Sequence, residues 1–195
     1  YASSACEMVA EVLQYIGDDG IKIKPAEADA MYAGIVIDTN NFMNQAGVRT
    51  FEAAAFLRRN GADVVRVRKL FRDRLEDYRA RAEAIQKAEI YHGAFAISVC
   101  PSEGLESPTV VGAQAANELL DIVGIKASFI LTQMGDTIYF SARSIDEINV
   151  QIIMERLGGG GHRTIAGAQL KGATIDEARE KLKDLITDMM EKGEI

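Results

Sequence analysis

Four consecutive glycines, residues 158–161, stand directly before His162, which is one of two histidines in the chain. Glycine has no Cβ and tolerates positive φ, so a run of glycines lets several backbone N–H groups converge on one point. Such a concavity binds anions, and His162 adds a directed donor while Arg163 adds a fixed positive charge. These residues favour binding of a phosphate, or of a phosphate together with the edge of a base.

The alternative is that the glycine run only ends a helix. Gly158 suits the left-handed position after a helix that ends at Leu157, but a helix end requires one glycine and not four. Each further glycine costs about 0.5–1 kcal/mol of backbone entropy relative to alanine. The spacing G-x-x-x-x-G-K-[ST] is absent, which excludes a P-loop, and G-x-G-x-x-G after a strand is absent too, which argues against a Rossmann site.

Ser141 and Arg143 are candidate partners of the glycine run. They alternate with the apolar Ala142 after the apolar residues 137–140, so in a strand both side chains point to one face. If that face meets the glycines, the guanidinium of Arg143 can bind a phosphate through two hydrogen bonds. The alternative is an ordinary, half-exposed strand end.

Asp38 follows the apolar residues 34–37 and is a candidate metal ligand. If residues 25–38 form a helix, its carboxylate lies at the C-terminus, where the helix dipole disfavours an acid by about 0.3–1 kcal/mol. A bound cation would remove this conflict. The alternative is that residues 35–38 form a strand and that Asp38 belongs to a turn.

The elements that must position these residues fall into two parts. Apolar periodicity and capping residues predict that residues 1–88 are nearly all helical, and the change of pattern near His92 predicts a smaller α/β part. Helices are predicted over residues 4–16, 25–38, 50–59, 63–70, 72–90, 109–123, 149–157 and 175–191. Strands are predicted over residues 94–100, 127–133, 137–143 and 166–173.

Composition narrows the class of protein. The chain is 48% apolar and 26% charged, and no apolar run approaches the ~20 residues of a membrane helix. Cys6 and Cys100 are too few for a disulfide framework, so a reducing cytoplasm is the expected compartment. The net charge of −7 argues against binding of long nucleic acid, which usually requires a basic domain.

Basic residues nevertheless gather in one segment. Residues 49–89 hold eleven of the 22 basic residues against seven acidic ones. One interpretation is attraction of a phosphate-bearing ligand, and the other is a solvated helical face with i,i+4 ion pairs.

Taken together, the segments GIVIDTNNF, SARSIDEINVQIIMERLGGGGH and AGAQ resemble the DHH phosphoesterase superfamily, and most closely its GdpP-type cyclic-di-AMP phosphodiesterases. The resemblance covers nearly the whole chain. It implies an α/β fold in which residues 1–71 are the helical C-terminal part of a DHH domain and residues 72–91 a linker helix. Residues 92–195 would be the DHH-associated, substrate-binding domain with a mixed sheet.

The resemblance also implies a reaction and a role for each site residue. Asp38 matches a ligand of a two-manganese site, and the reaction would be hydrolysis of cyclic-di-AMP to the linear 5′-phosphorylated dinucleotide. Two metal ions would activate the attacking water and stabilise the oxygens of an in-line displacement. The implied substrate-binding residues are Ser141, Arg143, Gly159, Gly160, Gly161 and His162.

The sequence departs from the family in its metal ligands. The family's other ligands lie N-terminal to the part that matches, no DHH motif occurs here, and the two histidines are His92 and His162. One carboxylate does not hold a binuclear site. We therefore expect a fragment that begins just after the DHH motif and is catalytically inactive by itself. Because members of this type are membrane-anchored with these domains on the cytoplasmic side, we expect no direct membrane contact by this chain.

Three functions remain open at this point. The first is the substrate-binding portion of a cyclic-di-AMP phosphodiesterase. The second is a nanoRNase for short oligonucleotides or a phosphoadenosine-phosphate phosphatase, because these enzymes share the DHH and GGGH motifs. The third is a nucleotide-binding sensor without chemistry. Family members commonly form dimers, so a homodimer is expected, with the apolar residues of the helices at 4–16 and 50–57 as candidate contacts.

Overall fold

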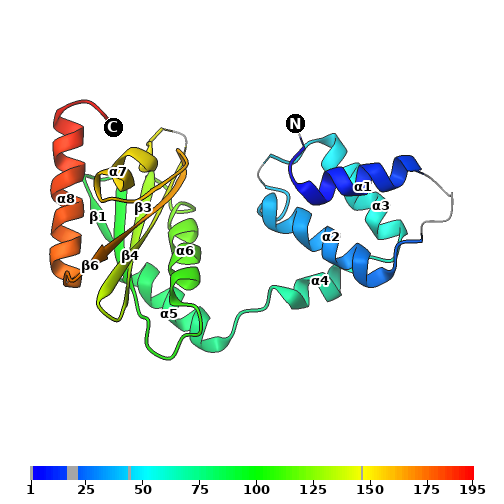
Figure 1. Ribbon diagram of the computed structural model, residues 1–195, viewed down its shortest axis with the longest axis horizontal. Helices are drawn as coiled ribbons and strands as arrows, with labels where there is room; N and C mark the ends of the chain where they lie inside the picture. Colours follow the sequence, from blue (N-terminus) through cyan, green and yellow to red (C-terminus); the bar gives the residue numbers. More distant parts are fainter. Residues whose placement is uncertain (1, 17–21, 44, 146) are drawn as a thin grey trace. The chain divides into compact units, whose positions relative to one another are not determined.

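The computed structural model describes residues 2–16, 22–43, 45–145 and 147–195. It consists of two compact units, residues 1–72 and residues 73–195 (Figure 1). The expected assignment of residues 1–71 to part of a DHH domain stays a prediction.

The first unit is helical throughout its described elements, as predicted. It comprises α1 (Ala5–Ile16), α2 (Pro25–Asp38), α3 (Val48–Arg59) and α4 (Val64–Leu70). The buried residues shared by the helices are Ala10, Ala28, Ile35, Ala53, Leu57 and Ala62. Because small residues dominate this core, α1, α2 and α3 pack closely. Helix α2 runs through Asp38, which confirms the helical interpretation of this segment over the strand.

Helix α1 is oriented differently from its apolar pattern. Met8, Val9 and Val12 are each at least half exposed, at 51%, 50% and 57%, while the buried side of the helix carries Glu7 and Ala10. A polar contact holds this orientation, because the Glu7 carboxylate accepts hydrogen bonds from the Ser3 N–H at 3.1 Å and the Thr50 hydroxyl at 2.7 Å. Burial alone would raise the pKa of Glu7, but these hydrogen bonds lower it below its ordinary value.

Helix α3 starts two residues before its predicted range of 50–59. It begins at Val48 with Gly47 as its N-cap, and the Thr50 hydroxyl accepts a hydrogen bond from the Gly47 N–H at 3.0 Å. This side chain therefore satisfies an amide at the helix start that has no partner within the helix.

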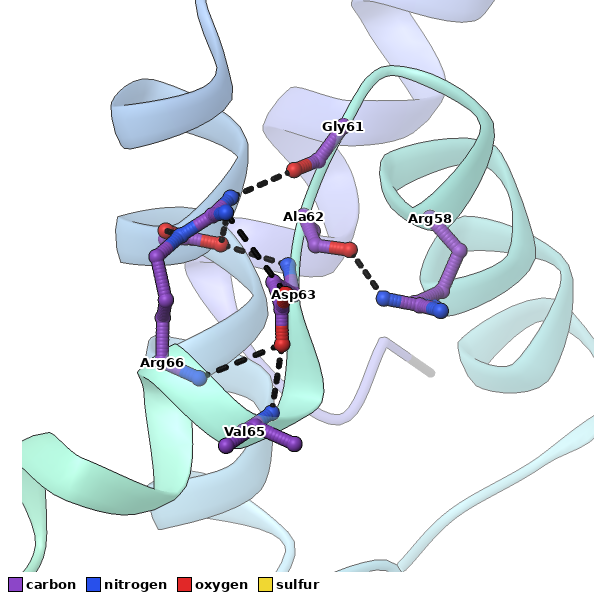
Figure 2. Close-up of polar contacts among 7 residues, drawn as sticks. Arg58, Gly61, Ala62, Asp63, Val65 and Arg66 are labelled. Carbon is purple, nitrogen blue, oxygen red and sulfur yellow. Dashed lines mark hydrogen bonds and ion pairs between the residues drawn. The ribbon is translucent and has the colours of Figure 1, made fainter.

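The basic segment is divided between the two units, with residues 49–72 in the first and residues 73–89 in the second. Arg66 donates to Asp29 from Nε at 2.7 Å and to the Gly61 carbonyl at 2.7 Å (Figure 2). Arg58 donates to the Ala62 carbonyl in the same region (Figure 2). These two guanidinium groups are engaged by acceptors of the fold itself, through one long-range ion pair and two backbone carbonyls and not through the i,i+4 ion pairs of the second interpretation.

The second unit is built on a mixed sheet with the order β1-β2-β3-β4-β6-β5 among its described residues. Strands β2 and β3 are parallel, and the other neighbours are antiparallel. The strands are β1 (Glu89–Tyr91), β2 (Phe95–Cys100), β3 (Ala127–Met134), β4 (Thr137–Ser144), β5 (Gly160–Gly161) and β6 (Ile165–Lys171). The predicted α/β fold with a mixed sheet is therefore confirmed.

Helices cover both faces of this sheet (Figure 1). Helices α7 (Val150–Arg156) and α8 (Ile175–Glu191) pack on one face, where the core includes Phe129, Phe140 and Leu182. Helices α5 (Leu75–Gln86) and α6 (Pro108–Leu119) pack on the other, where the core includes Ala84, Ile130 and Leu119.

The segment expected to form a linker helix packs within the second unit. Helix α5 contacts α6 and β2, so most of residues 72–91 belongs to the layer above the sheet. The helix is also shorter than the predicted range of 72–90. Its last predicted residues form β1, because a turn at His92 (φ 45°) and Gly93 (φ 74°) folds this segment back onto β2.

Helix α6 leaves part of its face of the sheet open. It packs on β2, β3 and β4. Its Gly112 lies so close to the sheet that an added Cβ would be 2.6 Å from the Thr132 hydroxyl oxygen. Beyond β4, this face of β6 and β5 carries exposed residues such as Ile165 at 53%. The open face of β4, β6 and β5 is the place where the predicted site residues meet.

Candidate functional site

The open face is organised by the register of three antiparallel strands. Residues that lie opposite one another in neighbouring strands project to the same face. Ser141 of β4 lies opposite Gly167 of β6, which in turn lies opposite Gly160 of β5. Strand spacing of about 4.8 Å puts β4 and β5 about 10 Å apart, with a floor of bare glycine backbone between them.

The next row of the same face brings the two predicted polar groups together. Arg143 lies opposite Ile165 in β6. His162 continues the ladder on the other side of Ile165, since its N–H donates to the Ile165 carbonyl at 2.7 Å and its own carbonyl accepts the Ile165 N–H at 3.2 Å. The imidazole is exposed and forms no hydrogen bond with the part of the chain that the structure describes. Arg143 and His162 therefore flank one end of the glycine floor.

The glycine run ends helix α7 with a Schellman motif. Gly158 has φ 80°, its N–H donates to the Glu155 carbonyl at 2.9 Å, and the Gly159 N–H donates to the Met154 carbonyl at 2.9 Å. The predicted helix stop is confirmed for Gly158. The N–H groups of Gly158 and Gly159 bond to the helix and that of His162 bonds to β6, so these three do not converge on one anion. The predicted nest stays a prediction for the amides of Gly160 and Gly161.

Close packing against β6 explains two more of the glycines. A Cβ at Gly159 would overlap the carbonyl oxygen of Gly167, and a Cβ at Gly161 would lie 2.5 Å from the Ile165 oxygen. Gly160 differs, because a Cβ there would meet no atom within 4 Å. Packing against β6 thus accounts for two of the four glycines and the helix end accounts for Gly158. Gly160 is left as the position where neither reason applies and bare backbone faces open space.

Arg143 is a partly buried cation held by neutral groups. Its Nε donates to the Asn117 side-chain oxygen at 2.9 Å, and one terminal nitrogen donates to the Ala142 carbonyl at 2.9 Å. Among the described residues no Asp or Glu lies within ion-pair distance, and burial lowers the pKa of Arg143. The guanidinium nevertheless remains protonated at neutral pH, as arginine side chains do in proteins. A buried charge is stabilised by a counter-ion, so this site favours an anion.

A cleft of about 550 Å³ opens over the same strands. Of the predicted substrate-binding residues its lining includes Ser141 and Gly159, and not Arg143, Gly160, Gly161 or His162. The other lining residues include Thr109, Tyr139, Gly167 and Gln169, which the sequence did not single out. The alternation in TIYFSAR and AGAQ contained the signal for Tyr139, Gly167 and Gln169, whereas Thr109 is brought in by the packing of α6.

Asp38 lies in the other unit, as the last residue of α2, and it is exposed. The chain reverses after it through Asn40, Asn41 and Phe42, which have φ values of 45°, 59° and 64°. Three consecutive non-glycine residues in the left-handed region are strained, and such strain concentrates at functional turns. Burial, followed by the charge of Asp38, raises the pKa of the Cys6 thiol, so this carboxylate lies near Cys6.

A metal site is not completed by these residues. In the described ranges, no group of three or more His, Cys, Asp or Glu side chains could hold a metal ion. The same residues contain no helix that is both long and apolar enough to cross a membrane.

Comparison with known proteins identifies the second unit. Residues 94–188 match the DHHA1 domain. The chain is 44% identical over 99% of its length to the cyclic-di-AMP phosphodiesterase GdpP of Geobacillus thermodenitrificans. It is 43% identical over 100% of its length to the cyclic-di-AMP phosphodiesterase PdeA of Listeria monocytogenes. It spans 29% of the length of each relative.

A solved structure shares the fold. An exopolyphosphatase-related protein from Bacteroides fragilis matches 96% of this chain and 57% of its own chain, with a TM-score of 0.83 and 20% sequence identity. At this level of identity the match supports a common fold and leaves the activity open.

Proposed function

The chain belongs to the DHH phosphoesterase superfamily through its DHHA1 domain, and on this premise we propose that it is the substrate-binding portion of a metal-dependent cyclic-di-AMP phosphodiesterase. The names of two relatives that match the chain along nearly its whole length support this substrate. The full enzyme would hydrolyse one phosphodiester bond of cyclic-di-AMP and release the linear dinucleotide. A homodimer on the cytoplasmic face of the membrane belongs to the same proposal.

The observation that supports the proposal most strongly is the environment of the Arg143 guanidinium. A partly buried guanidinium that pairs with no carboxylate of the described residues, held by Asn117 beside the glycine floor, suits the phosphate of a nucleotide better than a structural ion pair. His162 would contact the same phosphate from the far side of the floor. Ser141 and Gly160 would then lie under the ribose, where the missing side chain lets the sugar approach the backbone.

The proposed metal chemistry requires more ligands than this chain gathers. Asp38 is proposed as one carboxylate ligand, and manganese as the ion. A two-metal site needs several oxygen and nitrogen ligands, and the described residues offer no group of three. These residues therefore do not fit a complete site, and we assign no hydrolytic step to them. We expect the 195-residue chain to bind its ligand without hydrolysing it.

Calorimetry combined with a turnover assay tests this proposal. The chain is titrated with cyclic-di-AMP, with its linear product and with a dinucleotide that lacks the 5′-phosphate, and each mixture is incubated with Mn²⁺. We expect binding of cyclic-di-AMP or its linear product, and no conversion.

Two outcomes would contradict it. Failure to bind any of the three ligands would refute the binding role, and hydrolysis at the rate of a full-length relative would refute the inactivity of the chain. Tighter binding of the dinucleotide without the 5′-phosphate would favour a short-oligonucleotide nuclease instead.

A further inference from the structure

We propose that Tyr139 and Gln169 form a nucleobase subsite that selects adenine over guanine, which rests on the proposed binding of a nucleotide at this face. The two residues lie directly opposite each other, Tyr139 in β4 and Gln169 in β6. Both line the 550 Å³ cleft together with Thr109 from the first turn of α6. Neither residue belongs to the glycine run or to its histidine.

The subsite lies at the opposite end of the open face from Arg143. Successive rows on this face hold Arg143 with Ile165, then Ser141 with Gly167, then Tyr139 with Gln169. Tyr139 and Arg143 are four residues apart in one strand, which corresponds to about 13 Å. A nucleotide phosphate beside Arg143 therefore directs the sugar over Gly167 and the base toward Tyr139 and Gln169.

Tyr139 offers a surface for stacking. Its side chain is half-buried in β4, so the ring position is held by the sheet while part of the ring remains available to a ligand. Aromatic side chains stack on bases with little dependence on base identity. The ring would therefore contribute affinity, and selection among bases must come from another group.

Gln169 has the hydrogen-bonding groups for that selection. Its side chain is exposed, and in the described part of the chain its amide has no hydrogen-bond partner, so donor and acceptor are both available. A glutamine amide matches the N6 donor and N7 acceptor of adenine with two hydrogen bonds. The corresponding edge of guanine presents two acceptors, O6 and N7, and only the amide NH₂ could pair with one of them.

Calorimetry on the whole chain tests the subsite. It compares the affinities of two linear 5′-phosphorylated dinucleotides, diadenylate and diguanylate. We expect tighter binding of diadenylate by roughly tenfold or more, since one bidentate base contact gives this order of discrimination. Replacement of N7 by carbon in both adenines should weaken the binding of diadenylate by a similar factor. Gln169→Arg should shift the ratio toward diguanylate, because arginine pairs with O6 and N7 of guanine.

Gln133→Arg is the matched control, because Gln133 is an exposed glutamine of β3 outside the cleft and the substitution adds the same charge. It should leave the adenine-to-guanine ratio unchanged. Equal binding of both dinucleotides, with a ratio that Gln169→Arg does not change, would overturn the subsite. In that case, a loss of affinity for both dinucleotides in the Arg143→Ala variant would show that the proposed phosphate site is still valid. If neither dinucleotide binds to the wild-type chain at all, the proposed function fails as well.

Discussion

Arg143→Ala should weaken binding of cyclic-di-AMP or its linear product to this chain by about a hundredfold or more. Hydrogen bonds to a charged group contribute about 1.5–3 kcal/mol each, and the guanidinium is placed to form two with one phosphate. Arg143 is held by Asn117 and the Ala142 carbonyl, so its loss removes no ion pair between residues that the structure describes. Calorimetry measures the affinity, and circular dichroism checks that the variant is folded.

Two further variants separate charge from geometry. Arg143→Lys keeps the charge but loses the two-pronged donor, so we expect an intermediate affinity. Arg179→Ala removes one positive charge from α8, which covers the other face of the sheet, and should leave binding nearly unchanged. An Arg143→Ala chain that stays folded and binds within twofold of the wild type would refute the phosphate site.

Alanine substitutions at two neighbouring glycines, which look equivalent in the sequence, should have different effects on stability and on ligand binding. Gly159→Ala should destabilise the second unit by about 1–3 kcal/mol or more, because its Cβ would overlap the backbone of Gly167 in the adjacent strand. Gly160→Ala should leave the free energy of unfolding nearly unchanged, since a Cβ there meets nothing within 4 Å. Its effect should appear in ligand affinity instead, because the methyl group would occupy the open floor of the site.

Urea unfolding and calorimetry on the two alanine variants distinguish these effects. We expect Gly159→Ala to lower the urea midpoint and Gly160→Ala to weaken binding at an unchanged midpoint. A Gly160→Ala chain with wild-type affinity would remove this residue from the site. Equal loss of stability in both variants would show that the whole run serves packing.

Several elements followed directly from the sequence because their signals are local. Thr174 and Glu177 predict the start of α8, and in the structure their side chains cap the helix reciprocally. The alternation in residues 137–143 predicts that Ser141 and Arg143 share a face, which the register of β4 confirms. These features depend on side chains within a few residues of each other, so a linear pattern contains them.

Other features depend on pairings between distant segments. Strand β5 is two residues long, and its pairing with β6 was not predicted because two glycines have no strand periodicity. That pairing places two of the four glycines, Gly160 and Gly161, in the sheet. Strand β1 replaced the end of a predicted helix because it pairs with β2. The site residues Tyr139 and Gln169 lie opposite each other only through the register of β4 and β6, which a single sequence does not specify.

The orientation of α1 was also beyond the local pattern. The apolar residues Met8, Val9 and Val12 recur at helical spacing, yet each is at least half exposed, while Glu7 is buried. The three hydrogen-bonding groups that surround Glu7 come from Ser3 and from Thr50 in another helix, so their combined effect depends on tertiary packing.

The central claim is that the open face of β4, β6 and β5 binds the nucleotide. The most direct test is nuclear magnetic resonance of the ¹⁵N-labelled chain during titration with cyclic-di-AMP and with its linear product. The claim predicts the largest amide shifts for Ser141, Gly160, Gly161 and Gly167, with smaller shifts in α8. Shifts confined to residues 1–72, or to α7 and α8 without the glycines of β5 and β6, would contradict it.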